Sequence, residues 1–92
     1  MTSEAQFFLS HLGQTSPFPF LIEVDRAEGA YIYDKKGKSY LDMIAGVAVN
    51  NIGHRHPDVV KAIKDQVDKY MHLMVYGEFI QSPQVQLAGE IA

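Results

Sequence analysis

The sequence predicts an α+β segment in which an N-terminal helix, a small antiparallel meander and two further helices follow one another. Apolar residues recur at helical spacing near both ends of the chain. The middle of the chain instead contains short strand-like runs separated by turns that contain glycine. Composition agrees with a folded chain, because 47% of the 92 residues are apolar and only 21% are charged.

The first predicted helix begins at Ser3-Glu4-Ala5-Gln6, which has the form of a capping box with the serine as its cap. An apolar stripe follows, and Gly13 is a natural stop for the helix. Residues 14–20 then predict an ordered connector, since Pro17 and Pro19 favour extended backbone in the residues before them.

The meander is predicted to contain three short strands, at residues 21–24, 30–33 and 38–43. Glu28-Gly29 is a turn between the first two strands, and Asp34-Lys35-Lys36-Gly37 is a hairpin loop between the second and third. Residues 44–51 are small and apolar, so they form either another strand or a close-packed loop.

Two further helices are predicted, one from Pro57 and one from Ser82-Pro83, with Ser82 as the N-cap. The buried face of the first is defined by apolar residues at helical spacing: Val60, Ile63, Val67, Tyr70 and Met74. Asp65 and Lys69 are spaced for a weak ion pair on its outer face. The second has no stop residue before Ala92, so we expect the sequence to be part of a longer protein.

Several functional classes are excluded by composition. A net charge of −3 gives no reason to expect nucleic acid or an anionic membrane as partner. The absence of cysteine excludes disulfide scaffolds, cysteine-based zinc sites and thiol catalysis. The sequence has no signal-peptide pattern and no run long enough to span a membrane, so we expect a cytoplasmic protein.

Five side chains in the middle of the chain invite a chemical role. His54 and His56 could share a metal, but a site needs further ligands, so no metal is expected and His54 should instead bond backbone near the helix start. Asp34, Asp42 and Glu28 could do acid–base work. We predict instead that Asp34 caps its turn and that Asp42 anchors the loop after it.

The sequence offers no complete active site. None of the six lysines has the apolar or charged surroundings expected of a Schiff-base lysine, and no glycine-rich phosphate loop is present. Residues 72–80 form an apolar, aromatic stretch that contains Gly77 and Tyr76. This stretch could line a ligand cleft or pack against a partner, and the sequence leaves both open.

Two runs of the sequence, read in order, form a recognisable set: Glu28–Asp42 (EGAYIYDKKGKSYLD) and Gly46–Pro57 (GVAVNNIGHRHP). They resemble the N-terminal region of class III aminotransferases, a group that includes acetylornithine, ornithine and 4-aminobutyrate aminotransferases. Each piece alone is weak, but the ordered set, with G-H-x-H-P directly before an amphipathic helix, is quite specific. The resemblance runs from about residue 17 to the end of the chain.

The resemblance implies a fold-type I enzyme, normally several times longer, that binds pyridoxal phosphate on a lysine of a downstream large domain. Residues 1–92 would be its N-terminal segment, incomplete without that domain, holding no catalytic residue and inactive alone. The parent would be a homodimer that moves an amino group from an acetylornithine-like or omega-amino donor to a 2-oxo acid such as 2-oxoglutarate.

Three residues would then bind substrate: Gly46, Val47 and Tyr76. In ornithine-using relatives the position of Val47 is a tyrosine that meets the distal amine of the substrate, so valine here favours the acetylornithine type. Contacts to the cofactor stay unassigned. The alternative to an enzyme is a non-catalytic α+β module for packing or partner binding. Expressed alone, the segment should expose apolar surface and be sticky.

Overall fold

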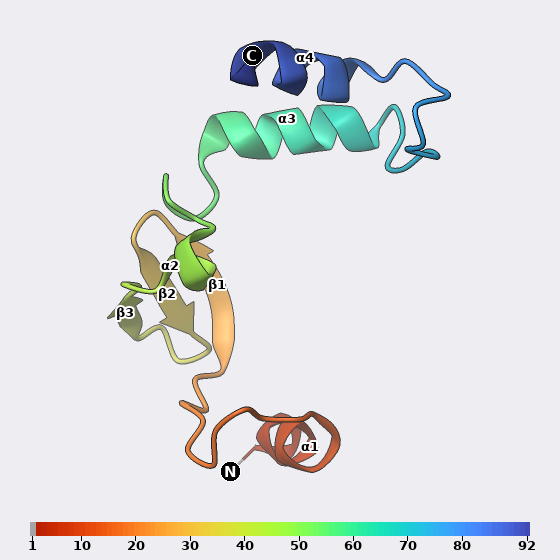
Figure 1. Cartoon of the computed structure of the whole chain (residues 1–92). Helices are drawn as coiled ribbons and strands as arrows, with labels where there is room; N and C mark the ends of the chain where they lie inside the picture. The colour runs from red at the N-terminus through yellow and green to blue at the C-terminus, as the bar shows by residue number, and fades with distance from the viewer. Residues whose placement is uncertain (1) are drawn as a thin grey trace. The chain divides into compact units, whose positions relative to one another are not determined.

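The computed structural model describes residues 2–92, which divide into two compact units with the boundary between Val60 and Lys61. The order of elements confirms the predicted α+β segment (Figure 1). These elements are α1 (Ser3–His11), β1 (Val24–Glu28), β2 (Tyr31–Asp34), β3 (Ser39–Leu41), α2 (Ala45–Ala48), α3 (Pro57–Val67) and α4 (Ser82–Ile91).

The three strands form one antiparallel sheet in the order β1-β2-β3. The strand predicted at residues 21–24 is wrong, because the strand starts at Val24 and Leu21 has a positive φ of 56°. Pairing with β2 decides these bounds: Arg26 lies opposite Tyr33, and its guanidinium stacks 3.8 Å from the centre of that ring. The polar sequence of β1 gave no alternating pattern from which to predict it.

The β2–β3 hairpin confirms the predicted loop at residues 34–37, although β3 is shorter than the predicted 38–43. One oxygen of Asp34 accepts from the amides of Lys36 and Lys38, each at 2.9 Å, and the other accepts from the Tyr40 hydroxyl at 3.1 Å. Gly37 takes the left-handed conformation that closes the loop, with φ of 86°. Asp34 is therefore the turn residue that the sequence predicts.

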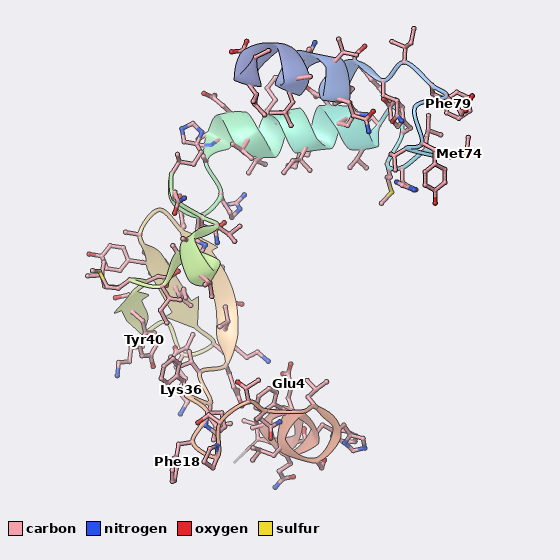
Figure 2. The ribbon with its side chains drawn as sticks, in the orientation of Figure 1. Glu4, Phe18, Lys36, Tyr40, Met74 and Phe79 are labelled. Carbon is pink, nitrogen blue, oxygen red and sulfur yellow. The ribbon has the colours of Figure 1, made fainter. Side chains whose placement is uncertain are left out.

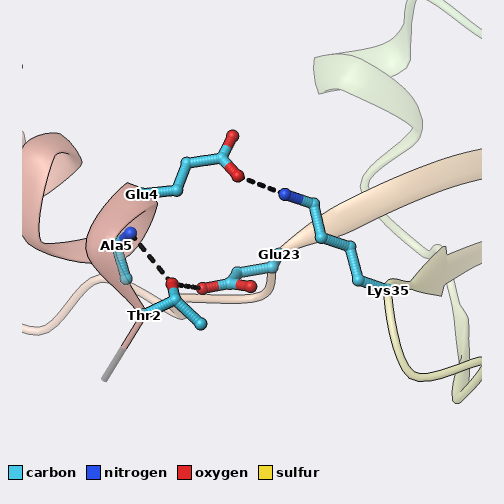
Figure 3. Close-up of polar contacts among 5 residues, drawn as sticks. All are labelled: Thr2, Glu4, Ala5, Glu23 and Lys35. Carbon is cyan, nitrogen blue, oxygen red and sulfur yellow. Dashed lines mark hydrogen bonds and ion pairs between the residues drawn. The ribbon is translucent and has the colours of Figure 1, made fainter.

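The start of α1 differs from the predicted capping box, because Thr2 and not Ser3 is the N-cap. Thr2 has extended backbone, and its Oγ1 accepts from the amide of Ala5 at 3.1 Å (Figure 3). The same hydroxyl donates to Glu23, just before β1, and Glu4 pairs with Lys35 after β2. Contacts with residues distant in sequence thus tie the helix start to the ends of the first two strands.

The C-terminal helices begin where predicted and differ in detail. α3 ends at Val67, so Tyr70 and Met74 lie beyond it and do not belong to its apolar face. Lys61 and not Lys69 is the ion-pair partner of Asp65, with N···O at 2.6 Å. The N-cap of α4 is the buried Gln81 and not the predicted Ser82, which is the first residue of the helix; the Gln81 side-chain amide donates to the Met74 carbonyl at 3.3 Å.

Apolar side chains are partly or largely exposed throughout the described residues, none of which contributes a buried apolar core. Phe18 in the first unit and Met74 and Phe79 in the second are examples, and Figure 2 labels all three. The expected exposure of apolar surface is therefore present, while sticky behaviour of the isolated segment stays a prediction. None of the helices in residues 2–92 has the length and apolarity that crossing a bilayer requires.

Candidate functional site

The best-organised polar group of the N-terminal unit is the Asp42 carboxylate, which follows β3. Its Oδ1 accepts from the amides of Ile44 and Ala45, both at 3.0 Å. Its Oδ2 accepts from His54 Nε2 at 2.6 Å. The two side chains are 8% and 16% exposed, so water competes little for this contact. The prediction that Asp42 anchors the following loop is confirmed.

His54 bonds differently from the prediction. Its imidazole contacts the Asp42 carboxylate, not the backbone at the start of α3. An ionised carboxylate has no proton to donate, so Nε2 of His54 is the nitrogen that carries the proton. The Ala45 amide, and then the His54 side chain, hold the pKa of Asp42 below its ordinary value. The carboxylate therefore stays charged, as an anchor should.

The backbone of His54 is fixed as firmly as its side chain. Its amide donates to the Gly29 carbonyl at 2.8 Å, and its carbonyl accepts from the Gly29 amide at 3.0 Å. Gly53 has φ of 93°, and a Cβ there would lie 3.2 Å from the Gly29 carbonyl oxygen. Only glycine meets both conditions comfortably. The Gly-His pair of G-H-x-H-P thus locks this loop against the end of β1.

The segment that Asp42 anchors is the turn α2, which is neither of the two predicted forms. Four successive residues have a positive φ: Ala45 at 55°, Gly46 at 64°, Val47 at 63° and Ala48 at 62°. The left-handed conformation costs an L residue about 1–2 kcal/mol, and three of the four carry a Cβ. Contacts with the rest of the unit must hold such a turn, and Asp42 supplies the contacts at its start.

The predicted substrate residues Gly46 and Val47 are central in this turn. A Cβ on Gly46 would lie 3.2 Å from the Asn50 side-chain amide, so the position also favours glycine for space. Val47 is 83% exposed, and its positive φ is rare for a β-branched residue. Tyr76 belongs to the second unit, in the irregular segment between α3 and α4, and is also 83% exposed.

Sequence reasoning missed the Asp42–His54 contact and the Gly29–His54 bridge. The sequence carried a signal only for the amide contacts of Asp42, because an aspartate commonly accepts from backbone amides two or three residues later in a local turn. Nothing in the spacing of residues 42 and 54 indicates that the histidine returns to that carboxylate. The separate hollow of about 600 Å³ beside α1 is lined by Thr2, Phe20 and Tyr40 among others, and not by the turn.

The lysines of the described residues do not fit the pyridoxal phosphate that the family resemblance implies. All six lie exposed, whereas a lysine that binds this cofactor needs a lowered pKa. Hydrogen bonding to Glu4 raises the pKa of Lys35, which is the opposite direction. Nor do three or more histidine, aspartate or glutamate side chains of residues 2–92 gather as metal ligands.

Comparison with known proteins finds the same family by a family model and by individual relatives. The family described as aminotransferase class-III matches residues 13–92. Acetylornithine aminotransferase of Bifidobacterium longum is 44% identical over 68 residues, which cover 74% of this chain and 15% of that protein. The acetylornithine aminotransferase of Methanopyrus kandleri is 39% identical over 84 residues, covering 89% of this chain and 20% of that protein.

Solved structures of the same family share the fold. The taurine:2-oxoglutarate aminotransferase of Bifidobacterium kashiwanohense, solved with PLP and glutamate, superposes with a TM-score of 0.80 at 29% identity and covers 99% of this chain. The N-acetylornithine aminotransferase of Stenotrophomonas maltophilia gives 0.73 at 33% identity over 92% of this chain. This chain spans 21% of each of those two.

The family match thus extends over most of the chain, and the structural neighbours share its fold. The α+β segment is accordingly a part of the fold-type I architecture, to which the pyridoxal-phosphate-dependent aminotransferases of this class belong. The chain belongs to the class III aminotransferase family.

Proposed function

We propose that the protein containing this segment is a pyridoxal-phosphate-dependent aminotransferase that takes an acetylornithine-like donor and passes its amino group to a 2-oxo acid such as 2-oxoglutarate. The observation that carries this proposal is the similarity of residues 13–92 to class III enzymes, with acetylornithine aminotransferases among the relatives. The segment spans only 15–20% of those relatives, so the activity is proposed for the whole protein.

The segment contributes shape and not proton transfer in this proposal. Its lysines are exposed, so the cofactor and the catalytic lysine belong to the large domain of the whole protein. The exposed apolar side chains support packing of the segment against that domain. The proposal keeps the homodimer and the cytoplasmic location expected above, which size-exclusion chromatography and cell fractionation test.

Gly46 and Val47 in the first unit, and independently Tyr76 in the second, are proposed as substrate-binding residues of the whole protein. Support comes from the strained turn that presents Val47 outward, since residues in rare backbone conformations concentrate at functional sites. Val47 is apolar and cannot accept from an amine, which favours a donor whose group at this position is not a free amine. This is the physical argument for acetylornithine over ornithine.

The test is the absorbance spectrum of the complete gene product with pyridoxal phosphate added. We expect the visible band of lysine-bound cofactor, lost on adding acetylornithine and restored by 2-oxoglutarate. Loss with 4-aminobutyrate alone would keep the aminotransferase and change the donor. Absence of the band would refute the enzyme and favour a non-catalytic packing or partner-binding module.

A second arm of the test addresses donor choice at residue 47. Val47→Tyr places a hydroxyl where an unacylated distal amine would lie, so activity with ornithine should rise relative to acetylornithine. Val49→Tyr is the matched control, because Val49 is similarly exposed and has an ordinary φ of −92°. An unchanged donor ratio in Val47→Tyr would remove Val47 from the proposed substrate site.

A further inference from the structure

The turn α2 is held by one connected set of contacts. Asp42 binds the amides of Ile44 and Ala45 with one oxygen and His54 with the other, while His54 is bridged through its backbone to Gly29. The set joins three separate stretches of the chain: the end of β1, the end of β3 and the G-H-x-H-P loop. The side chains of Asp42 and His54 make these hydrogen bonds with residues other than Val47.

The conformation of the turn makes this anchoring necessary. Ala45, Val47 and Ala48, on either side of Gly46, lie in the left-handed region, which a free chain seldom populates. Backbone bonds inside the turn run from the amides of Val49 and Asn50 to the Ala45 carbonyl, both at 2.8 Å. These close the turn upon itself but do not fix it to the sheet. The Asp42 contact holds Ala45, the first residue of the turn, and so fixes the turn to the end of β3.

We propose that Asp42 and His54 are positioning residues that hold the Ala45–Ala48 turn in its left-handed form and so set where Val47 meets the amine donor. This inference rests on the proposed function for what the turn faces. Neither residue touches substrate in this account. They act through the backbone of Ala45, and the effect appears as discrimination between donors and not as loss of the chemical step.

The experiment uses the complete protein with two donors that share a reacting amine. Acetylornithine carries an acetamido and a carboxylate group at the far end, and n-butylamine has the same aliphatic chain without them. Single-turnover loss of the cofactor's visible absorbance gives kcat/KM for each donor. In Asp42→Ala and His54→Ala we expect a roughly 10- to 100-fold fall for acetylornithine. The fall for n-butylamine should be below about threefold.

Matched controls separate positioning from general damage. Asp34→Ala removes a carboxylate with two amide partners and one side-chain donor, but in the other turn. His56→Ala removes an imidazole two residues from His54, whose Nδ1 accepts only from the Asp58 amide, at 3.2 Å, in the described contacts. Both should keep the wild-type donor ratio. His54→Gln keeps an N–H donor of similar reach and should restore most of the activity that His54→Ala loses.

Equal falls for both donors, or falls that follow the melting temperature and cofactor content of each variant, would overturn the positioning role. The double variant Asp42→Ala/His54→Ala should be no worse than Asp42→Ala, since both remove the same contact; additive losses would also count against it.

A crystal structure of the Asp42→Ala protein gives a readout that does not depend on activity. We expect residues 45–48 to leave the left-handed region in Asp42→Ala and to keep it in Asp34→Ala. If wild type shows no transamination, the proposed function fails while this comparison still decides whether Asp42 holds the turn. An unchanged turn in Asp42→Ala overturns the inference whatever the activity.

Discussion

The two aspartate turns of the N-terminal unit share a design and differ in strain. Asp34 and Asp42 each accept two backbone amides and one side-chain donor, the Tyr40 hydroxyl in one case and His54 in the other. In the Asp34 turn the one residue at positive φ is Gly37. In the Asp42 turn three non-glycine residues have a positive φ.

This difference separates a turn that only reverses the chain from a turn with a further task. A hairpin loop satisfies its geometry with a glycine and gains nothing from strain. A turn that keeps Val47 at positive φ against a cost of about 1–2 kcal/mol must be over-determined by its neighbours. The nearly buried Asp42–His54 contact provides that support. The variants below test the comparison from the largest expected effect to the smallest.

The largest effect is expected from Gly53→Ala, set against Gly37→Ala. Both glycines have similar positive φ, 93° and 86°. A Cβ on Gly53 meets the Gly29 carbonyl at 3.2 Å, whereas a Cβ on Gly37 meets nothing within 4 Å. We expect Gly53→Ala to lower the free energy of unfolding by about 2–3 kcal/mol and Gly37→Ala by about 1 kcal/mol.

Denaturant melts of the complete protein measure both variants. Gly53→Ala should also impair discrimination between acetylornithine and n-butylamine, because it opens the bridge that holds His54. Equal destabilisation by the two variants would mean that the Gly29–His54 bridge yields without cost.

The next effect is a gain in stability. Val47→Gly relieves about 1–2 kcal/mol of backbone strain and loses about 0.5–1 kcal/mol because glycine is more flexible in the unfolded chain. We expect a net stabilisation of about 0.5–1 kcal/mol together with weaker use of acetylornithine. Val49→Gly, where φ is −92°, should instead destabilise by about 0.5–1 kcal/mol. Thermal melts decide, and losses of the same sign in both variants would contradict the strain argument.

Both aspartates should behave alike toward acid. The pKa of Asp34 is lowered: its burial alone would raise the pKa, but the amides of Lys38 and Lys36 outweigh it. The pKa of Asp42 is lowered chiefly by the Ala45 amide and then by His54. A lowered native pKa adds stability that is complete above the unfolded value near 3.8 and is lost as pH falls through the native value.

The melting temperature of wild type should therefore fall below about pH 4 more steeply than that of Asp34→Asn or Asp42→Asn, which cannot titrate there. Melts at a series of pH values measure this. Only Asp42→Asn should change the donor ratio, so the pair separates stability from positioning. An Asp42→Asn profile parallel to wild type would show that this carboxylate adds no acid sensitivity.

The smallest effect is expected at the Lys61–Asp65 pair. Its N···O distance of 2.6 Å equals that of the Asp42–His54 contact, but its side chains are 77% and 59% exposed. Lys61→Ala should cost about 0.3–0.5 kcal/mol, and the cost should fade in high salt. Lys64→Ala in the same helix is the control. A Lys61→Ala cost well above 1 kcal/mol would show that distance and not burial sets the strength of these contacts.

Local chemistry made part of the fold predictable. Pro57 marks the start of α3, and the Asp34 loop follows from residues that favour turns. Other features depend on partners distant in sequence. Thr2 caps α1 while its hydroxyl also contacts Glu23, and β1 starts at Val24 because β2 pairs with it there.

The candidate site divides in the same way. Asp42 could be predicted as a loop anchor, since its amide partners are two and three residues away. The left-handed run could not, because alanine and valine give no local preference for positive φ. The family resemblance identified Gly46 and Val47 as candidates, and the structure adds the contacts that hold their turn.

The way α2 is anchored has a consequence for enzyme engineering. Asp42 holds the turn through the backbone amide of Ala45, and the exposed side chain at position 47 takes no part in that contact. A library randomised at Val47 should exchange donor chemistry on a stationary Cα. A library randomised at Ala45 would alter the residue that Asp42 holds, so its members would differ in the backbone geometry of the turn as well as in side chain.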